Sequence, residues 1–178
     1  MSRTRLVALD DAPDLAALLR ADRAFLAPFE PARDDAYFTE AGQRRVIANA
    51  LEQHAAGTAH PRVILDDDGR VVGRITLSGI ERGPFQSCRL GYLVSQHANG
   101  RGLATSAVGE VVGVAFGELG LHRVEAGTLL DNVRSQRVLE RNGFVRFGIA
   151  PAYLRIAGEW RDHVLFQRVS EEAAPRVR

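Results

Sequence analysis

The feature that most constrains the fold is a glycine-rich segment between a strand and a long helix. Leu90–Val94 is predicted to be a strand, and residues 102–119 repeat apolar side chains at helical spacing. Between them lies Asn99–Thr105, which contains two glycines and Arg101. Glycines let the backbone approach a ligand closely, and the free N–H groups at a helix start favour an anion. The segment is predicted to bind a pyrophosphate, although a turn that only starts the helix stays open here.

A second interpretation of this segment is a dinucleotide-binding fingerprint. Gly100–Thr105 is a near match to it, with Glu125 at the end of the next segment. Three observations weaken that reading. The third glycine is replaced by Thr105, the loop before Gly100 is longer than the tight turn requires, and most of the predicted strands come earlier in the chain.

The remaining segments alternate between strand and helix patterns. Asp67–Gly69 separates two β-rich runs and is predicted to be a hairpin turn in which both central residues take positive φ. Gly158 suits the first central position of a type II′ turn. Phe25–Pro31 is apolar and broken by prolines, which favours an ordered loop. The other expected elements are strands at 6–9, 62–66, 70–80, 89–94, 123–130 and within 152–168, and helices from Asp11 or Asp14, at 40–54 and at 132–142.

Composition limits the classes of function. The 178 residues suggest one domain with a full core, expected to span 1–169 and to leave a frayed tail at 170–178. A net charge of +1 gives no field that would recruit a nucleic acid or a membrane. The chain has no lysine, which excludes a P-loop. One cysteine and no apolar leader indicate a cytoplasmic protein.

Four motifs in order carry a family resemblance from about Phe25 to Gln167. Asn99, Gly102 and Ala104 occupy the key places of a pyrophosphate loop, with Asn99 departing from the usual glutamine or arginine. The other three motifs are Phe25–Pro31, Asp131–Ser135 followed by Val138–Phe144, and Gly158–His163. Together they resemble the GNAT acetyltransferases, and within them the RimJ/RimL type that acetylates protein N-termini.

The resemblance implies an α+β GNAT fold that uses acetyl-CoA. Its mixed, mostly antiparallel sheet would splay at the acetyl-CoA site, with helices on both faces. No metal and no covalent intermediate is implied. The acceptor would be an amine, preferably a protein N-terminal α-amine such as that of a ribosomal protein, bound near Phe29 and Glu30. The residues expected to contact acetyl-CoA are Leu93, Val94, Asn99, Gly100, Arg101, Gly102, Leu103, Ala104, Thr105, Asn132 and Ser135.

The expected chemistry is direct attack of the amine on the thioester. Ser135 matches the family serine near the sulfur and would protonate the departing thiolate, although a serine in a first helical turn also forms local bonds. Asn132 would bind the pantetheine arm, cap the helix, or do both. Glu125 is the candidate base if burial raises its pKa, the alternative being an ion-paired strand glutamate. Cys88 is interpreted as a small hydrophobe, and His163 as a hairpin partner of Asp162.

Other functions and partners stay open at this point. The acceptor amine could belong to a small molecule, and a non-catalytic module could bind acyl-CoA without transferring the acyl group. A homodimer is compatible with the sequence, whereas no direct contact with nucleic acid or membrane is expected.

Overall fold

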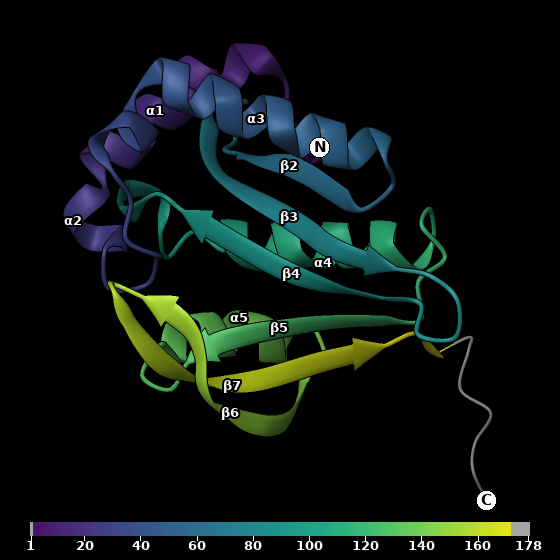
Figure 1. Ribbon diagram of the computed structural model, residues 1–178. Helices are drawn as coiled ribbons and strands as arrows, with labels where there is room; N and C mark the ends of the chain where they lie inside the picture. Colours follow the sequence, from purple (N-terminus) through teal and green to yellow (C-terminus); the bar gives the residue numbers. More distant parts are fainter. Residues whose placement is uncertain (1, 172–178) are drawn as a thin grey trace, which may run out of the picture.

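A seven-stranded sheet forms the centre of the protein, which we describe from a computed structural model over residues 2–171 (Figure 1). The strand order is β1-β2-β3-β4-β5-β7-β6. Only the β4/β5 pair is parallel, which confirms the predicted mixed, mostly antiparallel sheet. The strands are β1 (Thr4–Leu6), β2 (Ala59–Leu65), β3 (Val71–Glu81), β4 (Ser87–Val94), β5 (Arg123–Leu129), β6 (Val145–Ile156) and β7 (Glu159–Val169).

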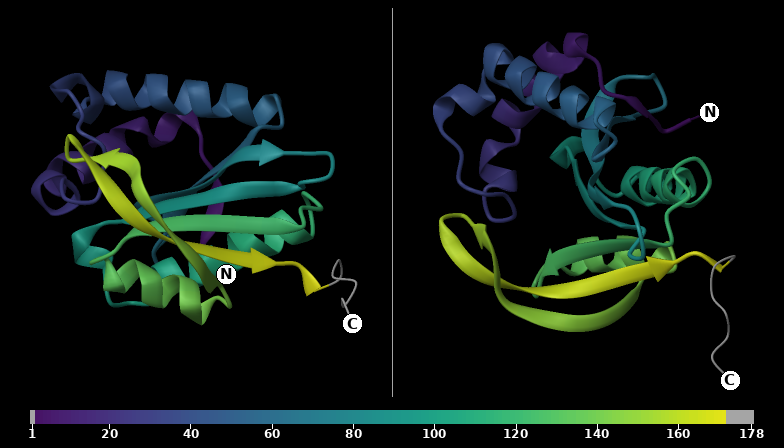
Figure 2. Two further views of the ribbon diagram at one scale, coloured as in Figure 1. Left: turned by 60° about the horizontal axis from the view of Figure 1, so that its bottom comes forward. Right: turned by 45° about the vertical axis from the view of Figure 1, so that its right-hand side comes forward.

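Helices cover both faces of the sheet, as predicted (Figure 2). The helices are α1 (Ala12–Ala21), α2 (Arg23–Leu26), α3 (Glu40–Ala55), α4 (Leu103–Phe116) and α5 (Val133–Arg141). Strand side chains alternate between faces, so neighbours in β2 join different cores. Val63 packs with Leu15 of α1 and Ile47 of α3, whereas Ile64 joins the larger cluster around Val111 of α4. Within residues 2–171, no helix combines the length and the apolar composition needed to cross a membrane.

Several local predictions need correction at turns and element ends. In the hairpin after β2, Gly69 takes φ +78° while Asp68 does not take a positive φ, so the expected pair of positive-φ residues is wrong. The β6/β7 turn has positive φ at both Ala157 and Gly158, which makes it type I′ rather than type II′. A type I′ turn suits the right-handed twist of a hairpin, and the sheet tolerates Ala157 in a strained conformation to obtain it.

The N-terminal segments also differ from expectation. The first strand is Thr4–Leu6 rather than 6–9, because the Asp11 carboxylate accepts a hydrogen bond from the Ala8 N–H at 2.8 Å and turns the chain. The segment predicted to be a loop at 25–31 begins inside α2, which ends at Leu26 before the prolines. At the other end, the Ser170 N–H donates a 2.9 Å hydrogen bond to the His122 carbonyl. Most of the predicted tail, residues 172–178, lies outside the described residues.

The feature that creates the site is the divergence of β4 from β5. These strands pair only where Ser87–Arg89 meets Arg123–Glu125, and they separate beyond that point (Figure 1). β4 stays hydrogen-bonded to β3 as far as Val94, and β5 stays paired with β7 as far as Leu129. The sheet is therefore split between two antiparallel halves, as the predicted splay requires.

Candidate active site

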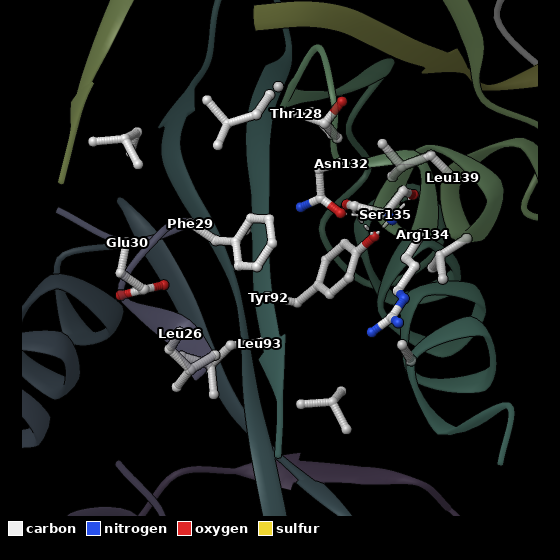
Figure 3. A pocket seen from close by; sticks show the side chains of 18 of the residues that line it. Leu26, Phe29, Glu30, Tyr92, Leu93, Thr128, Asn132, Arg134, Ser135 and Leu139 are labelled. Atoms are coloured by element: carbon white, nitrogen blue, oxygen red, sulfur yellow. Dashed lines mark hydrogen bonds between the residues drawn. The ribbon is translucent and has the colours of Figure 1, made fainter. Parts of the chain in front are cut away.

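A cavity of about 690 Å³ opens where β4 and β5 separate. The two diverging strands form its floor through residues 90–94 and 126–129, and the start of α5 and the Phe25–Pro31 segment form two of its walls. Figure 3 shows Tyr92, Asn132 and Ser135 gathered on one side of this pocket and Phe29 and Glu30 on the other. The cavity therefore brings together segments that are more than a hundred residues apart in the sequence.

The α5 side of the pocket holds a serine and a tyrosine in direct contact. The Ser135 and Tyr92 hydroxyl oxygens are 2.8 Å apart. Burial raises the pKa of Tyr92 to about 12, although the hydrogen bond with Ser135 acts in the opposite direction. The tyrosine hydroxyl is therefore neutral near pH 7 and retains a proton that it can donate.

Asn132 caps α5 from the same side of the pocket. Its Oδ1 accepts a hydrogen bond from the Ser135 N–H at 3.2 Å, which is the geometry of a helix cap. The cap fixes the first turn of α5 and so places the Ser135 hydroxyl beside Tyr92. Thr128 on β5 also lines the pocket, and its hydroxyl is buried without a hydrogen-bond partner among the described residues.

The opposite side combines apolar and charged groups from the segment between α2 and α3. Phe29 lies in the wall at 40% exposure and packs near Phe25, with ring centroids 6.5 Å apart. The Glu30 carboxylate forms a 3.3 Å ion pair with Arg74 on β3. Glu30 also borders a second cavity of about 500 Å³ between α3 and the β3/β4 surface. A substrate chain that enters from this second cavity would pass the carboxylate.

The glycine loop forms the remaining approach to the cavity. Gly100 and Gly102 have φ of +79° and +77°, and no atom lies within 4 Å of where their Cβ atoms would stand. Gly102 directly precedes α4, whose fourteen residues give it a full N-terminal set of free N–H groups. The loop thus has both the positive-φ backbone and the open space that a phosphate needs to approach it.

The side chains of this loop have different surroundings. Asn99 and Ala104 line the cavity, and Leu93 and Val94 lie on the adjoining strand. Leu103 is the first residue of α4 and is buried in the core, and Gly100, Arg101, Gly102 and Thr105 lie outside the cavity lining. The Arg101 guanidinium pairs with Asp67 at 2.9 Å rather than pointing into the cavity. This loop would therefore contact a ligand mainly through its backbone.

Two candidate chemical groups from the sequence lie away from the cavity. Glu125 pairs with Arg89 across the closed end of β4/β5, forms a 3.5 Å ion pair with Arg123 and does not line the cavity. The structure therefore does not bring Glu125 to Ser135, because the strands part only beyond it. Cys88 is buried in the core, where burial, followed by the charge of Glu125, raises the pKa of its thiol to about 12. A thiol that stays protonated is a poor nucleophile.

Sequence reasoning missed three polar residues of the cavity, Tyr92, Thr128 and His163. The Tyr92 hydroxyl contacts Ser135, 43 residues further along the chain, and the residue pattern of β4 does not predict that contact. His163 lines the cavity and is buried, whereas Asp162 points elsewhere and accepts a hydrogen bond from the Ala152 N–H at 2.8 Å. The expected His163–Asp162 pair is therefore wrong, because neighbouring residues of a strand face opposite sides of the sheet.

Comparison with known proteins decides the family. The model of the acetyltransferase (GNAT) domain matches residues 3–145. The chain belongs to the GNAT acetyltransferase family. This result confirms the resemblance seen in the sequence and excludes the dinucleotide-binding interpretation, which also requires a largely parallel sheet.

Individual relatives of this GNAT chain cover most of its length. A probable N-acetyltransferase of Bacillus subtilis, YjcK, is 38% identical over 160 residues, covering 89% of this chain and 88% of the relative. The ribosomal protein uS5-alanine N-acetyltransferase of Escherichia coli is 34% identical over 172 residues, covering 96% and 89%. The RimJ structure of Mycobacterium smegmatis in complex with CoA-disulfide superposes with a TM-score of 0.91 at 31% identity, covering 96% and 82%. The GNAT fold and RimJ/RimL-type relationship are thus established.

Proposed function

We propose that the protein transfers the acetyl group of acetyl-CoA to the α-amine of a protein N-terminus, with a ribosomal protein as the preferred class of acceptor. The observation that carries this proposal is the cavity between β4 and β5, flanked by a glycine loop at one end and a second cavity at the other. The RimJ relative with bound CoA supports the donor, and the uS5-alanine relative supports the acceptor. A ribosomal acceptor would place the enzyme in the cytoplasm. The GNAT domain would extend to Val169, where β7 ends.

The residues that surround the cavity fit acetyl-CoA as a substrate. In this proposal, the α4 N-terminus and the backbone of Gly100 and Gly102 bind the pyrophosphate. The pantetheine arm lies between the separated strands, beside Leu93, Val94 and Asn132. Backbone groups of β4 that face the gap have no β5 partner among the described residues, and one N–H there can hold the thioester oxygen.

The transfer itself requires a neutral amine and a protonated leaving group. The amine nitrogen attacks the thioester carbon, a C–N bond forms, and the C–S bond breaks. The Ser135 hydroxyl gives its proton to the thiolate, Tyr92 returns one to Ser135 along their 2.8 Å contact, and Tyr92 takes a proton back from solvent. Phe29 and Glu30 would guide the acceptor to the thioester from the opposite side of the cavity.

The acceptor class is tested by thiol release from acetyl-CoA with peptides whose first residue is varied. We expect release with a free N-terminal alanine peptide and none when the same peptide carries an N-terminal acetyl group. Because the chain has no lysine, acetylation of its own side-chain amines does not contribute to the signal. No acceptor-dependent release would refute the enzymatic proposal, and release only with small amines would refute the protein acceptor.

Replacement of Ser135 by alanine is expected to slow turnover by at least about tenfold, because positioned acid catalysis commonly contributes more than that. Affinity for CoA should change less, because the Asn132 side chain accepts a hydrogen bond from the backbone N–H of residue 135. Alanine retains that N–H, so the helix cap is kept. Steady-state kinetics and calorimetric titration with CoA separate the two effects.

The matched variants are Tyr92→Phe and the double variant that combines Ser135→Ala with Tyr92→Phe. Because the two hydroxyls act as one unit, removing both is expected to cost little more than removing Ser135 alone. Losses that simply multiply, or an equal loss of CoA affinity and turnover in Ser135→Ala, would contradict the proton-transfer role.

A further inference from the structure

His163 is a buried histidine whose place in the acetyl transfer has not been assigned. It lies on β7 at 3% exposure and lines the cavity between β4 and β5. Its neighbours Val164 and Phe166 join the core packed on α4, so the His163 side chain lies on the other face of the sheet. Tyr92 reaches toward α5 on the α4 side. The histidine and the tyrosine therefore approach the gap from opposite faces.

The hydrogen bonding of His163 fixes which ring nitrogen is free. Nδ1 lies 2.9 Å from the carbonyl oxygen of Arg161. A carbonyl only accepts, so Nδ1 carries the proton and Nε2 holds the lone pair of the neutral ring. Nε2 has no hydrogen-bond partner among the described residues. It also differs from the fully buried polar atoms that lack a partner, because it is not among them. Nε2 therefore keeps some accessible surface, in a side chain that lines the cavity.

Gly127 leaves room beside that nitrogen. A Cβ built on Gly127 would lie 3.7 Å from His163 Cδ2 and 3.5 Å from the Tyr153 ring. Cδ2 is bonded to Nε2, so the side of the ring that faces Gly127 is the carbon next to the basic nitrogen. Gly127 is on β5 just beyond the last residue paired with β4, where the gap begins. The His163 ring thus borders the gap from the face that the acceptor would use.

We propose that His163 is the general base that deprotonates the acceptor amine. This rests on the acetyl transfer proposed above and names the base for it. The acceptor ammonium gives one proton to Nε2 and becomes the nucleophile. Nε2 then releases this proton to solvent. After the C–N bond forms and the C–S bond breaks, the new amide nitrogen gives its second proton to the free Nε2, which passes it to solvent in turn. The thiolate takes its proton from Ser135 on the opposite face.

The surroundings of His163 suit this task. Charged and titratable groups line the same cavity or pack on the ring. Tyr153 on β6 packs on the ring, and Tyr92, Glu30, Asp131 and Arg134 line the same cavity. Arg161 is turned toward Asp131, with its guanidinium 3.8 Å from that carboxylate, so the cation is partly neutralised.

The test measures kcat of the full chain with acetyl-CoA and an N-terminal alanine peptide from pH 7 to 9.5. His163→Gln is expected to lower kcat at pH 7 by about a hundredfold, the lower range for general-base catalysis. The deficit should shrink as pH rises, because an α-amine with pKa about 7.7–8.0 then arrives neutral and needs no base. Imidazole added to His163→Ala should restore part of the rate at pH 7.

The matched control is His54→Gln, since the Nδ1 of His54 makes the same kind of bond, 3.1 Å to the Ala59 carbonyl, outside both cavities. It should keep wild-type kcat at every pH. A wild-type enzyme without acceptor-dependent release would refute the proposed function. An active wild type with a fully active His163→Gln, or with a deficit that is the same at pH 7 and 9.5, would refute the base.

A second variant keeps the proposal testable if the His163 substitutions do not fold. Gly127→Ala adds one methyl group at ordinary contact distance from the ring, so the fold should survive. The methyl group would stand against the ring carbon bonded to Nε2 and narrow the acceptor's approach, so kcat should fall severalfold while CoA affinity stays within about twofold of wild type. Unchanged kcat in Gly127→Ala would overturn the assignment.

Discussion

Replacing Gly102 by valine is expected to weaken CoA binding by at least about tenfold, equivalent to about 1.4 kcal/mol. Gly102 has φ +77° immediately before α4, a conformation that costs a residue with a side chain roughly 1–2 kcal/mol. No protein atom lies within 4 Å of its Cβ position, so the branched side chain would occupy the space left for the phosphates. Calorimetric titration with CoA measures the loss.

Gly57→Val is the control for this experiment. Gly57 has φ +72°, equally empty surroundings and a position outside both cavities. The two variants should therefore lose similar thermal stability, and only Gly102→Val should lose CoA affinity. Equal CoA affinity in the two variants would show that the loop does not bind the phosphates.

Replacing Phe166 by alanine is expected to lower the free energy of unfolding by about 3–5 kcal/mol, the usual cost of a large aromatic cavity. Phe166 is 2% exposed on β7 and packs in the core shared with α4. The loss is a large part of the roughly 5–15 kcal/mol that stabilises a typical domain. Urea denaturation followed by circular dichroism measures it.

Phe147→Ala is the matched control on the adjoining strand β6, where Phe147 is 45% exposed. Its loss should stay within about 0.5 kcal/mol, as for most surface substitutions. If both variants lost the same stability, Phe166 would not be a core residue. The pair also tests whether β7 is fixed by the larger core, on which the placement of His163 depends.

Much of the candidate site could be predicted because it depends on local signals. The loop at Asn99–Thr105 and the cap at Asn132 are short motifs whose geometry follows from residue type. Ser135 lies three residues after Asn132 and donates its N–H to the Asn132 cap, so both side chains lie on the same side of the cavity. These residues could be named without knowledge of the rest of the fold.

The remaining candidates depend on strand register, which the sequence did not reveal. Glu125 was expected near the thioester because its strand, β5, borders the gap. At Glu125, however, β5 is still paired with Arg89 of β4, so the gap opens only beyond this residue. The sequence suggested that His163 belongs to the surface of the hairpin. Because β7 pairs with β5 at the border of the gap, His163 lines the cavity instead. A shift of one residue in either register would exchange the two faces.

The sequence by itself determined the loop, the order of the elements and the membership of the GNAT family, because each depends on motifs within a few residues. Only the tertiary structure decided where β4 and β5 part, and hence which polar groups meet across the gap. Tyr92 with Ser135, and His163 over Gly127, are contacts between distant segments. They arise because two antiparallel halves share only a short parallel seam, a property of the whole sheet that no local pattern encodes.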